Sequence, residues 1–76
     1  MHRKALLSYD PSEGQWGYTL RGRWYRVRCG EQFGMKMGAG FVGCRLELDA
    51  HWYVELSNDI RFILHPRSIY TVLVDA

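Results

Sequence analysis

Glycine recurs through the middle of this chain so often that a long helix does not fit there. Glycines stand at positions 14, 17, 22, 30, 34, 38, 40 and 43. No window of about eleven residues sustains the i, i+3, i+4, i+7 spacing of an amphipathic helix. Between the glycines, apolar and polar residues alternate singly, as they do in half-buried strands. The sequence therefore predicts an all-β fold.

The alternating runs define the expected strands, and turn residues such as Asp10-Pro11 and Gly38-Ala39-Gly40 separate them. Further turns are expected at Arg21-Gly22-Arg23 and at Asn58-Asp59. The candidate runs lie at 5–9, 15–20, 24–29, 33–37, 41–49, 52–57, 60–64 and 69–74, and we expect six or seven strands among them. We predict a small SH3-like barrel or roll of six to seven short antiparallel strands, because closure removes exposed sheet edges.

The length of 76 residues allows one domain, which we place at 1–76. The hydrophobic content of 47% is enough for a small core. Met1 to Lys4 lead directly into Ala5-Leu6-Leu7, which is too short for the apolar region of a signal peptide. No run of residues reaches the length of a membrane span. We therefore expect a cytoplasmic protein with no membrane partner.

The two cysteines, Cys29 and Cys44, are expected to point inward as small hydrophobic residues. A disulfide between them is conceivable if their strands are neighbours. With His51 and His65 they are spaced too widely for the close ligand pairs of structural zinc sites. Paired carboxylates, a phosphate-binding glycine loop and a serine triad are also missing from the sequence. We expect no metal, no cofactor and no catalytic residue.

Arginine is concentrated around the third expected strand, where no acidic residue interrupts the run from 21 to 28. In the expected register one tryptophan and two arginines share its outward face. Arginines neutralise phosphates and an exposed aromatic ring can stack on a base, so this face is a candidate for binding nucleic acid. The alternative is that these side chains simply face water. The candidate binding residues are Arg21, Arg23, Trp24, Arg26, Arg28 and Tyr53.

The segment from Ile69 to Val74 is apolar on both faces. Such a strand could add to the sheet of an unknown protein partner, or pair with its own copy in a homodimer. Its alternative is burial on both faces within the fold. We take Ile69, Val72 and Val74 as candidate interface residues. Because protein interaction uses this segment and nucleic-acid binding does not, we favour a non-catalytic module for protein interaction or self-association.

Three segments occur in an order that resembles a known family. They are Val27-Arg28-Cys29-Gly30-Glu31, Cys44-Arg45-Leu46-Glu47 and Trp52-Tyr53-Val54. They resemble the Leu-x-Cys-Gly-Glu, Thr-Arg-Ile-Glu and Trp-Tyr-Leu elements of a bacterial family catalogued as domain of unknown function 5348. The resemblance covers about residues 5–57, and the family's glycine-containing last strand is not evident in 60–76. It implies a small β fold in bacteria, often near mobile genetic elements, with no assigned activity.

Overall fold

The structure, a computed structural model, describes residues 1–57 and 59–75, so the turn predicted at Asn58-Asp59 lies partly outside the described residues. All the regular structure among these residues is β-strand, and no helix long and apolar enough to cross a bilayer occurs in them. The strands are β1 (His2–Asp10), β2 (Gln15–Leu20), β3 (Arg23–Arg26), β4 (Gln32–Met37), β5 (Gly40–Leu48), β6 (Trp52–Leu56), β7 (Arg61–Ile63) and β8 (Tyr70–Asp75).

These strands form one antiparallel sheet of eight strands in the order β3-β2-β1-β8-β4-β5-β6-β7. The all-β prediction is confirmed, but the predicted closed barrel of six to seven strands is wrong. β3 and β7 are the two edges, and each pairs with only one neighbour. Both are short, and the chain leaves β3 after Arg26, so the two edges do not meet to close the sheet.

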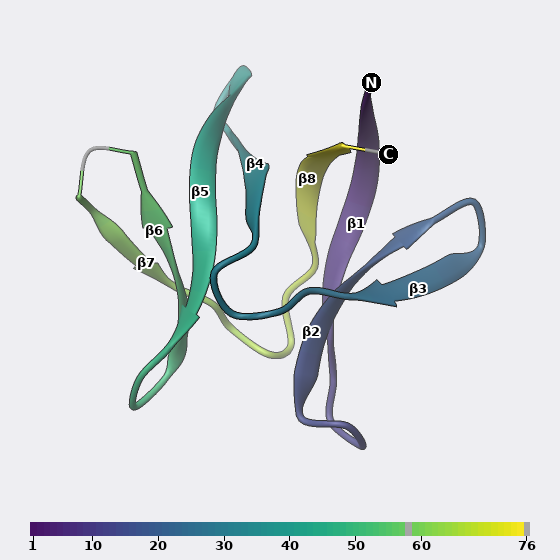
Figure 1. The fold of residues 1–76 in the computed structure, drawn as a ribbon, viewed down its shortest axis with the longest axis vertical. Helices are drawn as coiled ribbons and strands as arrows, with labels where there is room; N and C mark the ends of the chain where they lie inside the picture. Colours follow the sequence, from purple (N-terminus) through teal and green to yellow (C-terminus); the bar gives the residue numbers. More distant parts are fainter. Residues whose placement is uncertain (58, 76) are drawn as a thin grey trace.

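The sheet has two halves, visible on the right and left of Figure 1. We call β1, β2, β3 and β8 the basic half, for the charge described below, and β4 to β7 the groove half. Among the described residues, two ladder pairs between β4 and β8 join them, Gly34 with Leu73 and Met35 with Val72. β8 of the basic half and β4 of the groove half are the two central strands of the sheet. Their pairing, the joint between the halves, brings together residues that are far apart in sequence.

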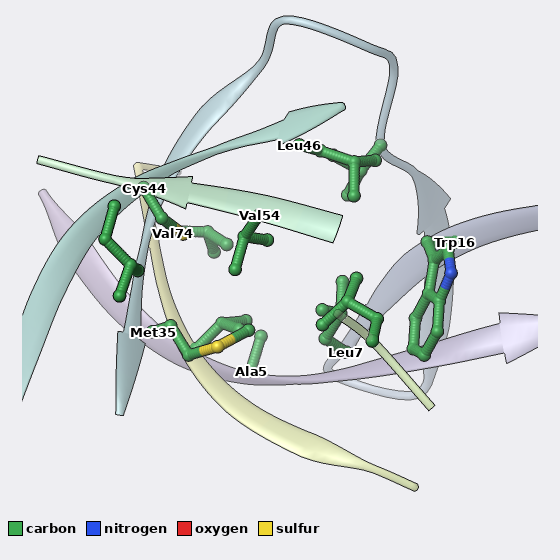
Figure 2. Packing of buried hydrophobic residues seen from close by; sticks show 12 residues of the cluster. Ala5, Leu7, Trp16, Met35, Cys44, Leu46, Val54 and Val74 are labelled. Carbon is green, nitrogen blue, oxygen red and sulfur yellow. The ribbon is translucent and has the colours of Figure 1, made fainter. Parts of the chain in front are cut away.

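One hydrophobic core connects the halves. Leu7 and Trp16 of the basic half are fully buried, as are Leu46 and Val54 of the groove half, and all four belong to one cluster (Figure 2). Their side chains come from alternate positions of each strand, so one face of the sheet is the core and the other faces solvent. Burying a leucine contributes about 2 kcal/mol. This shared core is what holds the two halves together beyond their narrow joint.

The segment between β3 and β4 crosses from one half to the other. The Val27 amide donates to the Trp16 carbonyl of β2 at 2.8 Å, and the Gly30 amide donates to the Leu46 carbonyl of β5 at 2.7 Å. Gly30 has a φ of 90°, which favours glycine. The Glu31 carboxylate accepts a bond from the Arg28 amide at 3.0 Å and so fixes the turn. The Cys-Gly-Glu motif therefore forms a structural bridge between the halves.

Candidate functional site

The β2–β3 hairpin carries the first two candidate arginines. Its two-residue turn places Arg21 at a φ of 55° and Gly22 at 77°, as a type I′ turn requires. Arg21 and Arg23 are both exposed, and the hairpin projects from the body of the sheet in Figure 1. The predicted turn at Arg21-Gly22-Arg23 is confirmed, and it places two cations at an outlying tip.

Trp24 lies on the outward face and covers Gly17 of the neighbouring strand. A Cβ atom on Gly17 would lie only 2.2 Å from Cε2 of the Trp24 ring and 2.3 Å from its Cζ2. The ring therefore occupies the space that a side chain at position 17 would need. Trp24 itself is half-buried, so part of the ring is open to solvent. Gly17 thus supports a flat aromatic surface on the outside of the sheet.

Arg26 stands beside this ring. It is two residues beyond Trp24 on the same strand, hence on the same face, and its cross-strand partner is Gly17. Thr19 pairs with Trp24, and Leu6 pairs with Thr19 and is 50% exposed. We call the outward-facing group Lys4, Leu6, Thr19, Trp24 and Arg26 the Trp24 face; it contains two cations and no carboxylate.

Charge differs between the two halves. Residues 1–28 and 70–76 carry six Arg or Lys against three Asp or Glu, whereas residues 29–69 carry four against five. The first set therefore has a formal charge of +3 and the second −1, which together give the +2 of the whole chain. The small net charge of the whole chain is therefore distributed unevenly, and the basic half is the part that would attract a polyanion.

Four of the six predicted binding residues do not join the Trp24 face. Arg21 is in the hairpin turn, and Arg23 pairs with Leu20 and so lies on the opposite face of the sheet from Trp24 and Arg26. Tyr53 lies on β6, near the opposite edge of the sheet, where the Arg61 guanidinium stands over its ring at 4.6 Å. Arg28 is exposed, but it lies beyond the end of β3 in the crossing segment. The predicted grouping is therefore corrected: Arg21, Arg23, Trp24 and Arg26 lie along one hairpin.

The predicted interface strand is part of the core. β8 pairs with β1 on one side and β4 on the other, so neither of its edges is free over the paired residues. Val72 is 0% exposed and Val74 is 5% exposed. These two valines cannot meet a partner without unfolding, which corrects the prediction. Ile69 precedes the strand and is 66% exposed.

Both cysteines are free, and their environments differ. Cys44 is buried in the core as predicted, and burial raises the pKa of its thiol to about 12. Cys29 is exposed on the crossing segment, so the prediction that it points inward is wrong. Among the described residues, no group of three or more His, Cys, Asp or Glu side chains could hold a metal ion.

A groove that the sequence did not reveal lies on the outward face of the groove half. It has a volume of about 760 Å³ and is built on the joint between the halves, where β8, β4 and β5 meet. We call it the Gly43 groove, after the glycine that faces Gly34 across β4 and β5. The residues that matter to its shape and charge are Gly34, Phe41, Gly43, Glu55, Leu73 and Asp75. The only sequence signal was a pair of glycines within otherwise alternating strands.

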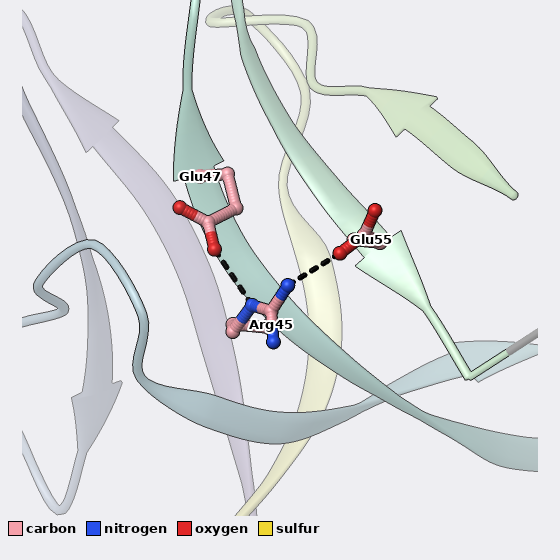
Figure 3. Close-up of polar contacts among 3 residues, drawn as sticks. All are labelled: Arg45, Glu47 and Glu55. Atoms are coloured by element: carbon pink, nitrogen blue, oxygen red, sulfur yellow. Dashed lines mark hydrogen bonds and ion pairs between the residues drawn. The ribbon is translucent and has the colours of Figure 1, made fainter. Parts of the chain in front are cut away.

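A network of ion pairs borders this groove. The Arg45 guanidinium donates to the Glu47 carboxylate at 2.6 Å and also to the Glu55 carboxylate of β6, as Figure 3 shows. Arg45 and Glu55 are cross-strand partners, so the network ties β5 to β6. At another part of the groove, a hydrogen bond from the Met1 amine lowers the pKa of Asp75 below its usual value.

A model of the family described as Domain of unknown function (DUF5348) matches residues 5–74. The match extends to Val74 in β8, beyond the segments that carry the resemblance in the sequence. No curated protein and no solved structure matches the chain.

Proposed function

Since the chain belongs to the DUF5348 family, whose description assigns no function, we propose a function from its surface: it is a non-catalytic module that binds single-stranded nucleic acid through the Trp24 face. The observation that carries this proposal is the Trp24 ring, held over Gly17 beside Arg26. A cytoplasmic location, predicted from the sequence, and the bacterial setting that the family resemblance implies are both compatible with such a ligand.

Two kinds of contact support a nucleic acid as the ligand. The solvent-open part of the Trp24 ring offers a surface on which a base can stack, a contact worth about 1–3 kcal/mol. Arg26 beside it, Lys4 on the same face and Arg21 at the tip of the hairpin can neutralise phosphates of the same strand. An acidic peptide would use the same arginines but would have no need of the ring. The tryptophan is therefore what favours a nucleic acid over an acidic protein.

The structure also changes the balance between the two binding hypotheses. Protein interaction was favoured because the segment from Ile69 to Val74 had no other use, but β8 is a central strand of the core. That support is gone, whereas the tryptophan and the arginines of the hairpin remain on the surface. Nucleic-acid binding therefore becomes the better supported proposal.

The test is fluorescence anisotropy of a labelled single strand of about 12 nucleotides, titrated with the protein at about 50 mM salt. We expect binding that weakens steeply with salt, with a slope of roughly −2 in log K against log salt for about three phosphates neutralised. Arg26→Glu should weaken binding by about tenfold or more, because it replaces an attraction with a repulsion. Trp24→Leu should weaken it by roughly 5-fold or more through lost stacking.

Arg67→Glu is the matched control, since Arg67 is exposed in the loop before β8, away from the hairpin. It changes net charge as Arg26→Glu does and should have a small effect. Circular dichroism checks that each variant is folded. The proposal fails if the unmutated protein gives no anisotropy change at low salt, or if both charge reversals weaken binding equally. If polyglutamate displaces the strand while Trp24→Leu changes nothing, the ligand is an acidic protein instead.

A further inference from the structure

Neither the backbone conformation nor the packing inside the chain requires a glycine at position 43. Its φ lies outside the left-handed region, and a Cβ atom at this position would meet nothing within 4 Å. Gly34 across the ladder differs, because its Cβ would lie 3.3 Å from that of Leu73. A glycine inside a strand is destabilising by about 0.5–1 kcal/mol relative to alanine. Because Gly43 has no side chain, the backbone of β5 is exposed on the floor of the groove, where another molecule can approach it closely.

Arg21 shows the opposite situation, because an arginine occupies a position whose backbone conformation glycine or asparagine adopts at lower energy. Its φ of 55° is left-handed, which costs a residue with a Cβ about 1 kcal/mol or more. The side chain that results is exposed at the tip of a projecting hairpin. The molecule thus has a protruding basic element and, on its other half, an open groove whose floor is backbone.

Charge and shape match these two elements to each other. Three carboxylates line the groove, those of Glu55, Asp59 and Asp75. Glu55 is bonded to the Arg45 guanidinium and Asp75 to the Met1 amine, which leaves one carboxylate in excess, that of Asp59. Phe41 and Leu73 give its apolar surface. A guanidinium is planar, stacks on aromatic rings and bonds carboxylates, so an arginine suits this lining better than a lysine does.

We propose that the β2–β3 hairpin of one copy docks in the Gly43 groove of a second copy. Arg21 and Arg23 then meet the groove's carboxylates, and the hairpin backbone approaches β5 at Gly43. The two contacting surfaces are different parts of the chain, so the association is head-to-tail. The hairpin also carries the proposed nucleic-acid face, and a bound strand competes with the second copy for Arg21.

The first measurement is sedimentation velocity of the full chain at low salt, from about 10 μM to about 1 mM, the range of weak association. We expect the sedimentation coefficient to rise with concentration. Gly43→Val should weaken the association at least tenfold, because the added side chain fills the floor, yet its thermal unfolding should match or exceed that of the unmutated protein. Gly40→Val is the matched control: its Cβ also meets nothing within 4 Å, and Gly40 does not line the groove.

The second measurement tests the head-to-tail geometry by mixing two variants. Arg21→Glu keeps an intact groove but loses the hairpin contact, and Gly43→Val keeps the hairpin but loses the groove. Each alone should be monomeric, whereas their mixture should form a heterodimer, because one intact hairpin and one intact groove are then present. A wild-type chain that stays monomeric throughout overturns the proposal, as does a monomeric mixture or an equal loss in Gly40→Val. Gly43→Val should bind the oligonucleotide normally, so this proposal and the nucleic-acid proposal fail separately.

Discussion

Gly17 and Gly43 are both strand glycines on the outward face, one in each half of the sheet, yet their surroundings differ completely. Gly17 is covered by Trp24, whose ring atoms lie within 2.3 Å of the position that a Cβ would take. Gly43 is covered by nothing within 4 Å. The first glycine is explained by the chain's own packing. The second is not, and this difference is why we look for its partner in another molecule.

The same contrast holds for charge in the two halves. Within the part of the chain that the structure describes, Arg21, Arg23 and Arg26 of the hairpin have no bonded carboxylate, whereas Arg45 of the groove half is bonded to both Glu47 and Glu55. An arginine held by two carboxylates organises its own strands. Arginines without such partners are available to a ligand. Composition alone does not separate these two uses of the residue.

The two halves differ on their outward faces but share one core on their inward faces, and Leu7→Ala, the change with the largest expected effect, tests whether that core is shared. Leu7 is fully buried in the basic half, and its truncation should lower the free energy of unfolding by about 3 kcal/mol. Leu46→Ala should do the same from the groove half. Urea unfolding followed by circular dichroism should show one transition for both variants. Two separate transitions in either variant would show that the halves are independent.

Gly17→Ala and Gly43→Ala test the contrast between the glycines directly. The new Cβ at position 17 would overlap the Trp24 ring and lie 2.6 Å from the Tyr25 carbonyl, so we expect a loss of about 2 kcal/mol. At position 43 the Cβ fits, and stability should stay equal or rise by about 0.5 kcal/mol. Thermal unfolding of the pair measures both. Equal destabilisation in the two variants would remove the argument for a groove that an external partner occupies.

Cys44, in β5 of the groove half, should make the free energy of unfolding depend on pH in the alkaline range. Its thiol has a pKa of about 12 in the folded protein and near 9.0 when exposed, so unfolding favours ionisation between these values. Stability should therefore be unaffected below pH 9.0 and fall as the pH rises through the window to 12. At about pH 10 the loss should be about 1.4 kcal/mol.

Urea unfolding of the unmutated protein and of Cys44→Ala, each at neutral and alkaline pH, isolates this effect from other titrating groups. The variant should lose about 1.4 kcal/mol less on going to pH 10. An identical pH dependence in both proteins would mean that the thiol is not buried as described. Labelling with a thiol reagent at neutral pH should modify the exposed Cys29 first.

Arg21→Asn should give a small gain in stability, about 0.5–1 kcal/mol. Asn-Gly is the preferred pair for a type I′ turn, and Asn tolerates a left-handed φ better than Arg does. Arg23→Asn is the control, because Arg23 is in a strand and should gain nothing. Thermal unfolding measures the gain, and anisotropy and sedimentation measure what is lost in binding. A variant with higher stability and full binding would show that the arginine at this position serves neither proposed contact.

The sequence by itself determined most of the local structure. Alternation and turn residues located β2 at its observed bounds, Gln15–Leu20, and placed the hairpin turn at Arg21-Gly22-Arg23. They also put Trp24 and Arg26 on one face, since a strand repeats every two residues. Each of these features depends on neighbours along the chain, which a sequence displays directly.

Only the tertiary structure decided which strands are neighbours. An apolar segment such as 69–74 has the same pattern whether it is an exposed interface or a central strand, and the pairing of β8 between β1 and β4 settled this in favour of the core. Alternation likewise gives no distance between Tyr53 and Arg26, which the sheet order places near opposite edges. The Gly43 groove exists because residues 34, 43 and 73 meet at one joint, and no local rule brings them together.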